Sequence, residues 1–390
     1  MYQFISPKKI YHGKGSLSKL EDILTELNIK TVFLLTDPIL EALGVILPIL
    51  EMLEKKEINV YVNKDVVPEP SIEVGNLVVE EVRQNKPDLV IGIGGGSALD
   101  LAKAAAVLAN NDGNIEDYLN LSGSIKLTNK GLPKVLIPTT SGTGAEVTDI
   151  AVFSLEDTKD VITHEFLLAD YAIIDPVLTY TLPSRVTAAS GIDAFTHALE
   201  SYTSVNATPV TETLALEAMS RIVGSIRRAV WNGQDHEARE QMALGSLLAG
   251  LSFYNAGVAG VHGLAYPLGG LFKIPHGESN AVLMAYVYDY IWPACIDKLV
   301  KVAEVFQLPT NGKSERELAK AVVKGLLDLV RDVGLPTTLA DYPIQLEDIH
   351  RLAENGSKQK RLLDRSPMPF TLEAIEKIYR NAFEGVLVNQ

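Results

Sequence analysis

Short apolar runs recur along the first half of the chain and predict the strands of a sheet. Runs that are apolar on both faces are typical of buried parallel strands. Between them, residues 71–84 and 98–110 carry the three- to four-residue apolar spacing of helices. The strands are expected at residues 31–36, 59–62, 88–93, 134–138 and 171–176.

After Pro183 the pattern changes to long helical periodicity. Strands that alternate with helices predict a mostly parallel sheet, and 390 residues are too many for one ordinary core. We therefore expect an α/β domain over residues 1–183 and an all-helical domain over residues 184–390. The helices of the second domain are expected at residues 186–204, 211–231, 236–252, 296–306 and 314–332.

The composition narrows the class of protein. The formal net charge of −14 argues against a nucleic-acid partner. Cys295 is the only cysteine, so neither an intrachain disulfide nor a cysteine metal cluster can form. No apolar stretch is long enough for a membrane span, and the first residues do not resemble a signal peptide. These features predict a cytoplasmic globular protein without membrane partners.

A glycine-rich turn at residues 94–97 joins a predicted strand to a predicted helix. Glycine lets the backbone approach a pyrophosphate, and the free N–H groups of a helix start attract anions. Ser97 is expected to cap the helix, with Asp100 completing a capping box. The turn differs from the GxGxxG fingerprint, so an ordinary glycine turn is the alternative.

Two further loops follow predicted strands. Residues 138–148 are rich in hydroxyl groups and glycine and could bind ribose, phosphate or a carboxamide; a polar surface loop is the alternative. Asp37 ends the strand at residues 31–36. A carboxylate there can accept hydrogen bonds from ribose and repel a 2′-phosphate, which favours NAD over NADP. The alternative is a plain Asp-Pro turn.

Four side chains suggest a metal site. Asp193 and His197 are four residues apart in a predicted helix and share one face. His262 and His276 lie in a glycine-rich segment. Separately, these residues would be explained as a surface ion pair and as two core histidines, but one carboxylate with three imidazoles suits Fe(II), Zn(II), Mn(II) or Co(II). Among the remaining histidines, His164 is the main alternative for a ligand contact.

Together these motifs resemble the iron-containing (group III) alcohol dehydrogenase family over essentially the whole chain. The resemblance is most specific in residues 94–100, 138–148, 191–198 and 267–277. It implies a dehydroquinate synthase-like architecture, with an N-terminal dinucleotide-binding α/β domain and an all-α C-terminal domain.

The resemblance also implies the residues of the site. Asp193, His197, His262 and His276 would hold the metal, Fe(II) in the first place and Zn(II) or Mn(II) as alternatives. The nucleotide would be NAD rather than NADP. The implied cofactor contacts are Asp37, Gly95, Gly96, Ser97, Asp100, Thr139, Thr140, Thr148, Lys159 and Leu178.

Two positions depart from the family pattern. Tyr266 stands where many members carry a histidine that relays a proton. A tyrosine hydroxyl titrates near 10 when unperturbed, so we expect Tyr266 or a water molecule to relay the proton. A tyrosine there also resembles the hydroxyacid–oxoacid transhydrogenase branch. Asp149 would disfavour anionic substrates if it faces the active site and would be an ordinary turn acid if it does not.

The predicted function is a metal-dependent, NAD-linked alcohol dehydrogenase. It would interconvert a small primary alcohol or diol with its aldehyde or ketone by hydride transfer, while the metal stabilises the developing alkoxide. A homodimer or larger homo-oligomer is expected. The alternatives are a hydroxyacid–oxoacid transhydrogenase with bound nicotinamide, a dehydroquinate-synthase or glycerol-dehydrogenase relative, and a non-catalytic nucleotide-binding structural protein.

Overall fold

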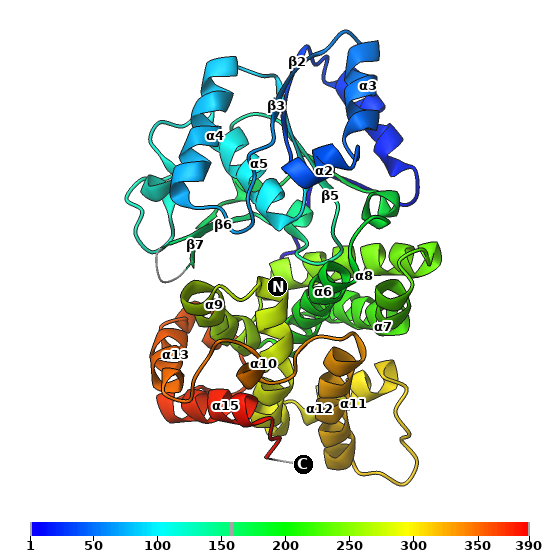
Figure 1. The fold of residues 1–390 in the computed structure, drawn as a ribbon, viewed down its shortest axis with the longest axis vertical. Coiled ribbons are helices and arrows are strands. Elements are labelled where there is room, and N and C mark those ends of the chain that lie inside the picture. The colour runs from blue at the N-terminus through cyan, green and yellow to red at the C-terminus, as the bar shows by residue number, and fades with distance from the viewer. Residues whose placement is uncertain (1, 156–158, 389–390) are drawn as a thin grey trace. The chain divides into compact units, whose positions relative to one another are not determined.

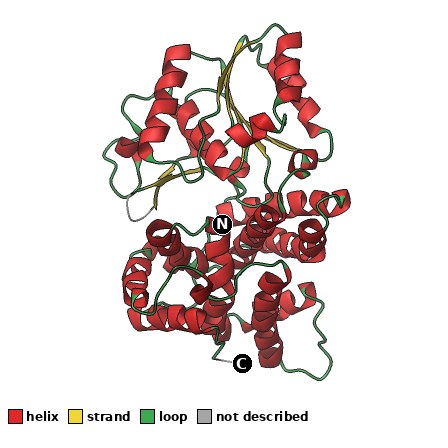
Figure 2. Ribbon diagram, in the orientation of Figure 1, coloured by secondary structure: helices red, strands yellow, loops and turns green. Residues whose placement is uncertain are grey.

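The computed structural model describes residues 2–155 and 159–388, and the chain forms two compact units. Every strand assigned in the described residues lies in the α/β unit, residues 6–181, and the helical unit begins at Leu182 (Figure 2). This confirms the predicted fold class. Residues 2–5 also belong to the helical unit, where Asn255 exchanges two hydrogen bonds of 2.7 and 2.9 Å with the Ile5 backbone.

The α/β unit contains a sheet of six parallel strands in the order β1-β8-β5-β4-β2-β3 (Figure 1). Five of them were predicted from apolar runs. The sixth, β1, is a half-buried edge strand and lacks such a run. The strands are β1 (Lys9–His12), β2 (Thr31–Leu35), β3 (Asn59–Asn63), β4 (Leu89–Gly94), β5 (Lys134–Pro138) and β8 (Tyr171–Ile174).

Helices cover both faces of this sheet. Successive residues of a strand point to opposite faces, so each strand contributes side chains to two cores. In β2, Val32 and Leu34 join one core, whereas Phe33 and Leu35 join the other. Burial on both faces explains why these strands are continuously apolar. The first core includes α1 (Lys19–Glu26) and α3 (Leu47–Lys55), and the second includes α4 (Ile72–Asn85) and α5 (Gly96–Leu108).

A second, two-stranded antiparallel sheet was not predicted from the sequence. It consists of β6 (Ile150–Ser154) and β7 (Lys159–Thr163). Ala151 and Phe153 alternate with half-buried residues and reach the core that includes α4 and α5. Strands this short carry too few apolar positions for the alternation to stand out in the sequence.

The helical unit has one core that includes residues from α6 to α15. The five predicted helices are present, and α6 is buried almost all round, as expected of a helix at the centre of a bundle. The prediction did not name α9, α10, α13, α14 and α15; in α9, glycines and Pro267 interrupt the apolar pattern. The helices are α6 (Ser184–Thr203), α7 (Pro209–Trp231), α8 (His236–Ala256), α9 (Gly260–Phe272), α10 (His276–Ile291), α11 (Ile296–Val305), α12 (Glu315–Asp332), α13 (Asp348–Ser357), α14 (Lys360–Leu363) and α15 (Leu372–Glu384).

Within residues 2–155 and 159–388, no single helix is long and apolar enough to cross a membrane. Helices α8 and α9 meet the length and composition test only as a pair, and the chain bends by 103° between them.

Candidate metal centre and cofactor loop

The structure brings all four predicted metal-ligating side chains together in the helical unit. Asp193 and His197 lie one turn apart on α6, His262 lies in the first turn of α9, and His276 begins α10. Asp193 Oδ1 is 3.9 Å from His197 Nε2, 3.7 Å from His262 Nε2 and 3.5 Å from His276 Nε2. The four ligand atoms all lie within 4.8 Å of one another.

The chemistry of these donors fits a divalent cation. Two atoms bound to one cation at about 2.1 Å can be no more than about 4.2 Å apart, and the three distances from Asp193 meet that limit. Burial alone would raise the pKa of Asp193, but His197, His276, His262 and the Asn280 amide outweigh it and lower that pKa. The cluster therefore combines an ionised carboxylate with three imidazoles.

Access to the cluster differs between its members. Asp193, His197 and His262 are buried, whereas 30% of the His276 side chain is exposed. His276 is therefore the one member of the cluster whose side chain is substantially exposed.

Glycines allow the helices of the cluster to pack closely. A Cβ atom on Gly191 would lie 2.7 Å from Met242 Cε, and one on Gly260 would lie 2.4 Å from Phe370 Cζ. A side chain at either position would have to displace Met242 or Phe370, so the packing there favours glycine.

Glu200 was not singled out from the sequence as a site residue, yet the structure places it against the cluster. It lies on α6 one turn beyond His197 and is buried. Its Oε2 lies 2.6 Å from His262 Nδ1, and its Oε1 accepts a hydrogen bond of 2.6 Å from Val261 N. An acid on the same helix face as Asp193 and His197 was the available sequence signal.

Asn280 was not singled out from the sequence. It lies on α10 one turn after His276 and is fully buried. Its Nδ2 is 2.7 Å from Asp193 Oδ1, 3.1 Å from His262 Nε2 and 3.3 Å from His276 Nε2. Its spacing of four from a predicted ligand was the only signal in the sequence.

Tyr266 and His164 occupy different environments. Tyr266 lies on α9, and its ring centroid is 6.2 Å from that of His276. Its role in proton relay stays a prediction. His164 lies in the α/β unit, where its Nδ1 accepts a hydrogen bond of 3.1 Å from Phe166 N at the start of a 3-10 helix. The structure gives His164 a capping role.

The predicted phosphate turn lies at the carboxyl end of β4. Gly94 has a φ of +154°, which residues with a side chain rarely adopt. Helix α5 begins at Gly96, and no side chain caps it. A Cβ on Gly96 would lie 2.9 Å from Thr143 Cγ2. Bare amide groups at a helix start, in a space that accepts only glycine, fit a pyrophosphate.

The predicted capping box is wrong. Gly95 is the N-cap, and Ser97 is the second helical residue, where its Oγ accepts a hydrogen bond of 3.0 Å from Glu69 N. Asp100 Oδ1 lies 2.7 Å from the fully buried Lys103 Nζ, and its Oδ2 accepts from Val152 N at 3.0 Å. A buried ammonium group needs a charged partner, so Asp100 pairs with Lys103 and does not cap the start of α5.

Asp37, Thr139 and Thr140 lie with the glycine turn at the carboxyl edge of the sheet. The Asp37 carboxylate caps α2 (Pro38–Ala42) by accepting from Ile39 N and Leu40 N, both at 2.9 Å. Thr139 N donates to the Gly94 carbonyl at 2.9 Å. A Cβ on Gly95 would lie 3.7 Å from Thr140 Cγ2. The ends of three parallel strands thus form one polar edge.

The remaining predicted cofactor residues have internal partners. Lys103 Nζ donates to Thr148 Oγ1 at 3.3 Å. Lys159 Nζ lies 2.7 Å from Glu69 Oε1, and the Glu69 backbone in turn contacts Ser97. Leu178 is buried in the core on one face of the sheet. Lys159 is therefore linked to the glycine turn through Glu69, although the sequence separates them widely.

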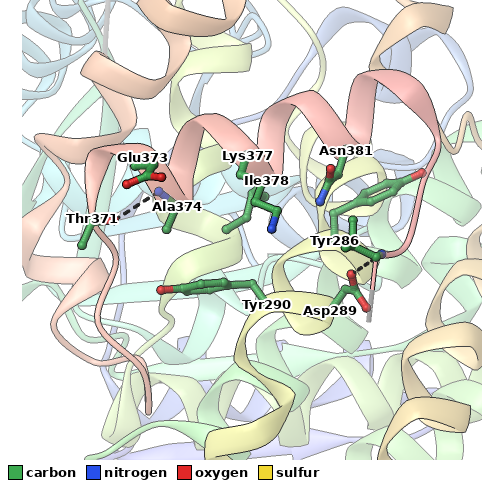
Figure 3. A pocket seen from close by; sticks show the side chains of 10 residues that line it. Tyr286, Asp289, Tyr290, Thr371, Glu373, Ala374, Lys377, Ile378 and Asn381 are labelled. Atoms are coloured by element: carbon green, nitrogen blue, oxygen red, sulfur yellow. Dashed lines mark hydrogen bonds between the residues drawn. The ribbon is translucent and has the colours of Figure 1, made fainter. Parts of the chain in front are cut away.

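The helical unit also contains a pocket that is separate from the cluster. It is lined by α10 and α15 side chains, among them Tyr290 and Lys377 (Figure 3). Val388 also lines it, and its backbone N–H donates a hydrogen bond of 2.7 Å to Asp289. None of the four cluster residues lines this pocket.

A parallel α/β unit with a glycine turn that fits a pyrophosphate, together with a helical unit that carries an Asp-His₃ cluster, is typical of a metal-dependent nucleotide enzyme. The family model described as iron-containing alcohol dehydrogenase matches residues 7–176. The model of the C-terminal part of the Fe-containing alcohol dehydrogenase family matches residues 187–383.

Individual proteins agree with the family models. Long-chain-alcohol dehydrogenase 1 of Geobacillus thermodenitrificans is 50% identical, over 99% of this chain and 98% of the relative. The 1,3-propanediol dehydrogenase of Citrobacter freundii is 34% identical over 98% and 99% of the two chains. A crystal structure of 1,3-propanediol oxidoreductase has a TM-score of 0.94 at 33% identity and covers 98% of this chain and 100% of its own.

The chain belongs to the iron-containing alcohol dehydrogenase family. The predicted family, enzyme class and alcohol dehydrogenase function are confirmed by these matches. The cofactor prediction agrees with the iron in the family description. It also agrees with a similar structure, sulfoacetaldehyde reductase of Bifidobacterium kashiwanohense in complex with NAD⁺, which has a TM-score of 0.87 at 26% identity and covers 98% of both chains.

Proposed function

We propose that the alcohol dehydrogenase activity of this chain depends on a divalent cation, Fe(II) in the first place, held by Asp193, His197, His262 and His276. The observation that carries the proposal is the convergence of their four donor atoms within 4.8 Å. Four nitrogen and oxygen donors suit a first-row transition metal, and Zn(II) and Mn(II) remain compatible with the same set.

The surrounding residues define what the site does. A bound divalent cation supplies a Lewis acid for the substrate oxygen. The buried side chains of Asp193 and His262 exclude water from one side, and the partly exposed His276 marks the side that substrate reaches. Tyr266, beside His276, is the side chain proposed to pass the substrate proton onward.

The cofactor is proposed to be NAD, bound along the carboxyl edge of the sheet. The uncapped start of α5 at Gly95 and Gly96 would receive the pyrophosphate, and Asp37 would accept a hydrogen bond from a ribose hydroxyl. Thr139 and Thr140 border the same edge. Asp100, Thr148, Lys159 and Leu178 are proposed to support the nucleotide site from their positions around this loop.

The substrate is proposed to be a primary alcohol or diol, or the corresponding aldehyde. The names of the relatives range from long-chain alcohols to 1,3-propanediol. Activity therefore has to be measured over alcohols and diols of different chain lengths to determine which of them this enzyme prefers. Turnover without added NAD, measured with a hydroxyacid and an oxoacid present together, separates a transhydrogenase from a dehydrogenase, because in the former the bound nicotinamide passes the hydride from one substrate to the other. A cytoplasmic homodimer or larger homo-oligomer is part of the proposal, and light scattering would measure the assembly.

The experiment that tests the metal site is His262→Ala. We expect the variant to lose bound metal and alcohol oxidation together, as measured by elemental analysis and by absorbance of the reduced nicotinamide. His350→Ala is the matched control, since this exposed histidine lies with Glu354 and Glu376 outside the cluster. If His262→Ala kept wild-type metal content and turnover, the proposed ligand set would be wrong.

A further inference from the structure

His262 is held from both of its ring nitrogens, by two side chains that come from different helices. Glu200 on α6 lies 2.6 Å from Nδ1, and Asn280 on α10 lies 3.1 Å from Nε2. Both partners are buried, with exposed fractions of 2% and 0%. Such contacts on both sides of an imidazole leave the ring little freedom to turn or to change tautomer.

The Glu200 contacts fix how the His262 ring is turned. The carboxylate accepts from Val261 N at 2.6 Å and from His262 N at 3.4 Å, at the start of α9, where the helix dipole also favours negative charge. With Nδ1 against Glu200, Nε2 faces Asp193 at 3.7 Å and is the ring nitrogen left for a cation.

Asn280 resolves the electrostatic problem that this arrangement creates. Lone pairs of Asp193 Oδ1, His262 Nε2 and His276 Nε2 converge in a buried space and would repel one another. The Asn280 amide nitrogen lies 2.7, 3.1 and 3.3 Å from these atoms, and its Oδ1 has no hydrogen-bond partner in the part of the chain that the structure describes. Asp193 Oδ1 can accept this hydrogen bond and keep a lone pair for a cation, whereas each imidazole Nε2 has only one lone pair. The hydrogen bond to Asp193 is therefore the Asn280 contact that is compatible with a bound cation.

We propose that Glu200 and Asn280 are positioning residues: Glu200 holds the His262 ring with Nε2 turned toward the cation site, and Asn280 holds the Asp193 carboxylate beside it. The inference rests on the proposed metal ligands. Neither residue needs to contact the cation, because each acts on the orientation of the ligands. Side chains in this relationship to a metal ligand commonly change affinity 10- to 100-fold when they are removed.

The test measures the dissociation constants of Zn(II) and Co(II) for the metal-stripped full-length protein, by titration against a competing chromogenic chelator. Glu200→Gln preserves the shape of the side chain but replaces one acceptor oxygen with a donor. Asn280→Ala removes the amide. We expect each variant to bind both ions about 10- to 100-fold more weakly, and the visible absorption of bound Co(II) to change because the ligand geometry changes.

Two matched variants control for ordinary loss of stability. Thr203→Val on α6 removes a buried hydrogen bond of 2.7 Å to Tyr288, and Ser279→Ala on α10 removes one of 3.3 Å to Ile274. Both should lower the melting temperature and leave the dissociation constants unchanged. If Glu200→Gln and Asn280→Ala changed only the melting temperature, as these controls do, the inference would be overturned.

A double-mutant cycle separates positioning from a structural role of Glu200 as a cap of α9. Because Glu200 acts on the cation through His262, Glu200→Gln should have no further effect on Zn(II) affinity in a His262→Ala background, whereas its effect on the melting temperature should persist. An undiminished effect on affinity in that background would contradict the inference. If His262→Ala itself bound Zn(II) like the wild type, the proposed ligand set would fail instead.

Discussion

The backbone of Gly277 lies against the carbonyl oxygen of Ala189, so closely that a Cβ atom on Gly277 would be 2.3 Å from that oxygen. Ala189 belongs to α6 and Gly277 to the first turn of α10, directly after His276. This contact sets the distance between the helix that carries Asp193 and the start of the helix that carries His276. It is the closest backbone approach at the proposed metal site, among the glycine contacts of the described residues.

Gly277→Ala should therefore damage the metal site. The added methyl group must push α10 away from α6, because the atoms it meets belong to backbone. We expect a loss of about 1–3 kcal/mol in stability together with weaker metal retention, measured by thermal unfolding and elemental analysis. Gly224→Ala on α7 is the control: nothing lies within 4 Å of its Cβ position, so it should stabilise the helix by roughly 0.5–1 kcal/mol. A Gly277→Ala protein with wild-type metal content would contradict this reading of the contact.

Loss of the buried Lys103 on α5 is expected to destabilise the α/β unit strongly. It is fully buried beside Asp100, and its Nζ also donates to the carbonyl groups of Ala145 and Ile150. Lys103→Met leaves the Asp100 carboxylate buried without a cation, which should cost about 3–5 kcal/mol. Adding Asp100→Asn should recover part of this loss, as measured by the melting temperature.

The control for Lys103 is Lys130→Met. Lys130 pairs with Asp170 at 2.9 Å but is 63% exposed, so its loss should cost under about 1 kcal/mol. Equal melting temperatures for Lys103→Met and Lys130→Met would show that the buried Lys103–Asp100 pair contributes no more to stability than the exposed Lys130–Asp170 pair.

Glu146 is expected to make stability depend on pH. It lies in the loop after β5 and is buried, and burial raises its pKa from 4.5 to about 7. Between pH 4.5 and about pH 7, Glu146 is protonated in the folded state and ionised in the unfolded state. The stabilising contribution is therefore complete below pH 4.5 and disappears as the pH rises through 7.

Glu146→Gln removes this titration. From pH 5 to pH 8 we expect the wild type to lose about 2–3 kcal/mol more than the variant, seen as a larger fall in melting temperature. Glu165→Gln, at an exposed acid, should leave the wild-type pH profile intact. If the melting temperatures of the wild type and Glu146→Gln fell equally from pH 5 to pH 8, Glu146 would not be the group that makes stability depend on pH.

Asp37 is expected to select NAD over NADP. Its carboxylate lies at the carboxyl end of β2, near the glycine turn, with Oδ2 3.8 Å from the Cβ position of Gly94. Asp37→Asn keeps an oxygen for the α2 cap but removes the negative charge that would repel a 2′-phosphate. The ratio of kcat/KM for NADP to that for NAD should rise about 10-fold, which corresponds to about 1.4 kcal/mol.

Asp88→Asn provides the matched control for Asp37. Asp88 likewise accepts two backbone hydrogen bonds, from Lys30 N and Thr31 N at 2.9 Å, but at the opposite end of β2. Its replacement should leave the cofactor preference unchanged. If Asp37→Asn and Asp88→Asn raised the NADP-to-NAD ratio of kcat/KM equally, Asp37 would not be the residue that selects NAD.

Much of the architecture was predictable because it depends on local patterns. Continuous apolar runs predict strands that are covered on both faces, and Phe33 and Val32 do lie in opposite cores. The pair of Asp193 and His197 was predictable for the same reason, since a spacing of four places two side chains on one helix face. His262 and His276 joined that pair through residue type and through the resemblance to a known family.

Short or interrupted elements were not predictable in this way. Helix α9 contains Pro267 and several glycines, which obscure its periodicity although the buried surroundings stabilise it. The cap of α5 was assigned to Ser97 because serine at a helix start is usually a cap, but Gly95 holds that position and Ser97 serves Glu69. Tertiary contacts overrode the local preference there.

The sequence by itself determined the two kinds of unit, the glycine turn and the four candidate ligands, because periodicity and side-chain chemistry act over one or two turns of the chain. Only the tertiary structure decided which side chains form hydrogen bonds with those ligands. Glu200 and His262 are 62 residues apart, and Asn280 and Asp193 are 87 apart. A hydrogen bond between such residues depends on how the helices pack in three dimensions, and no local pattern encodes that packing.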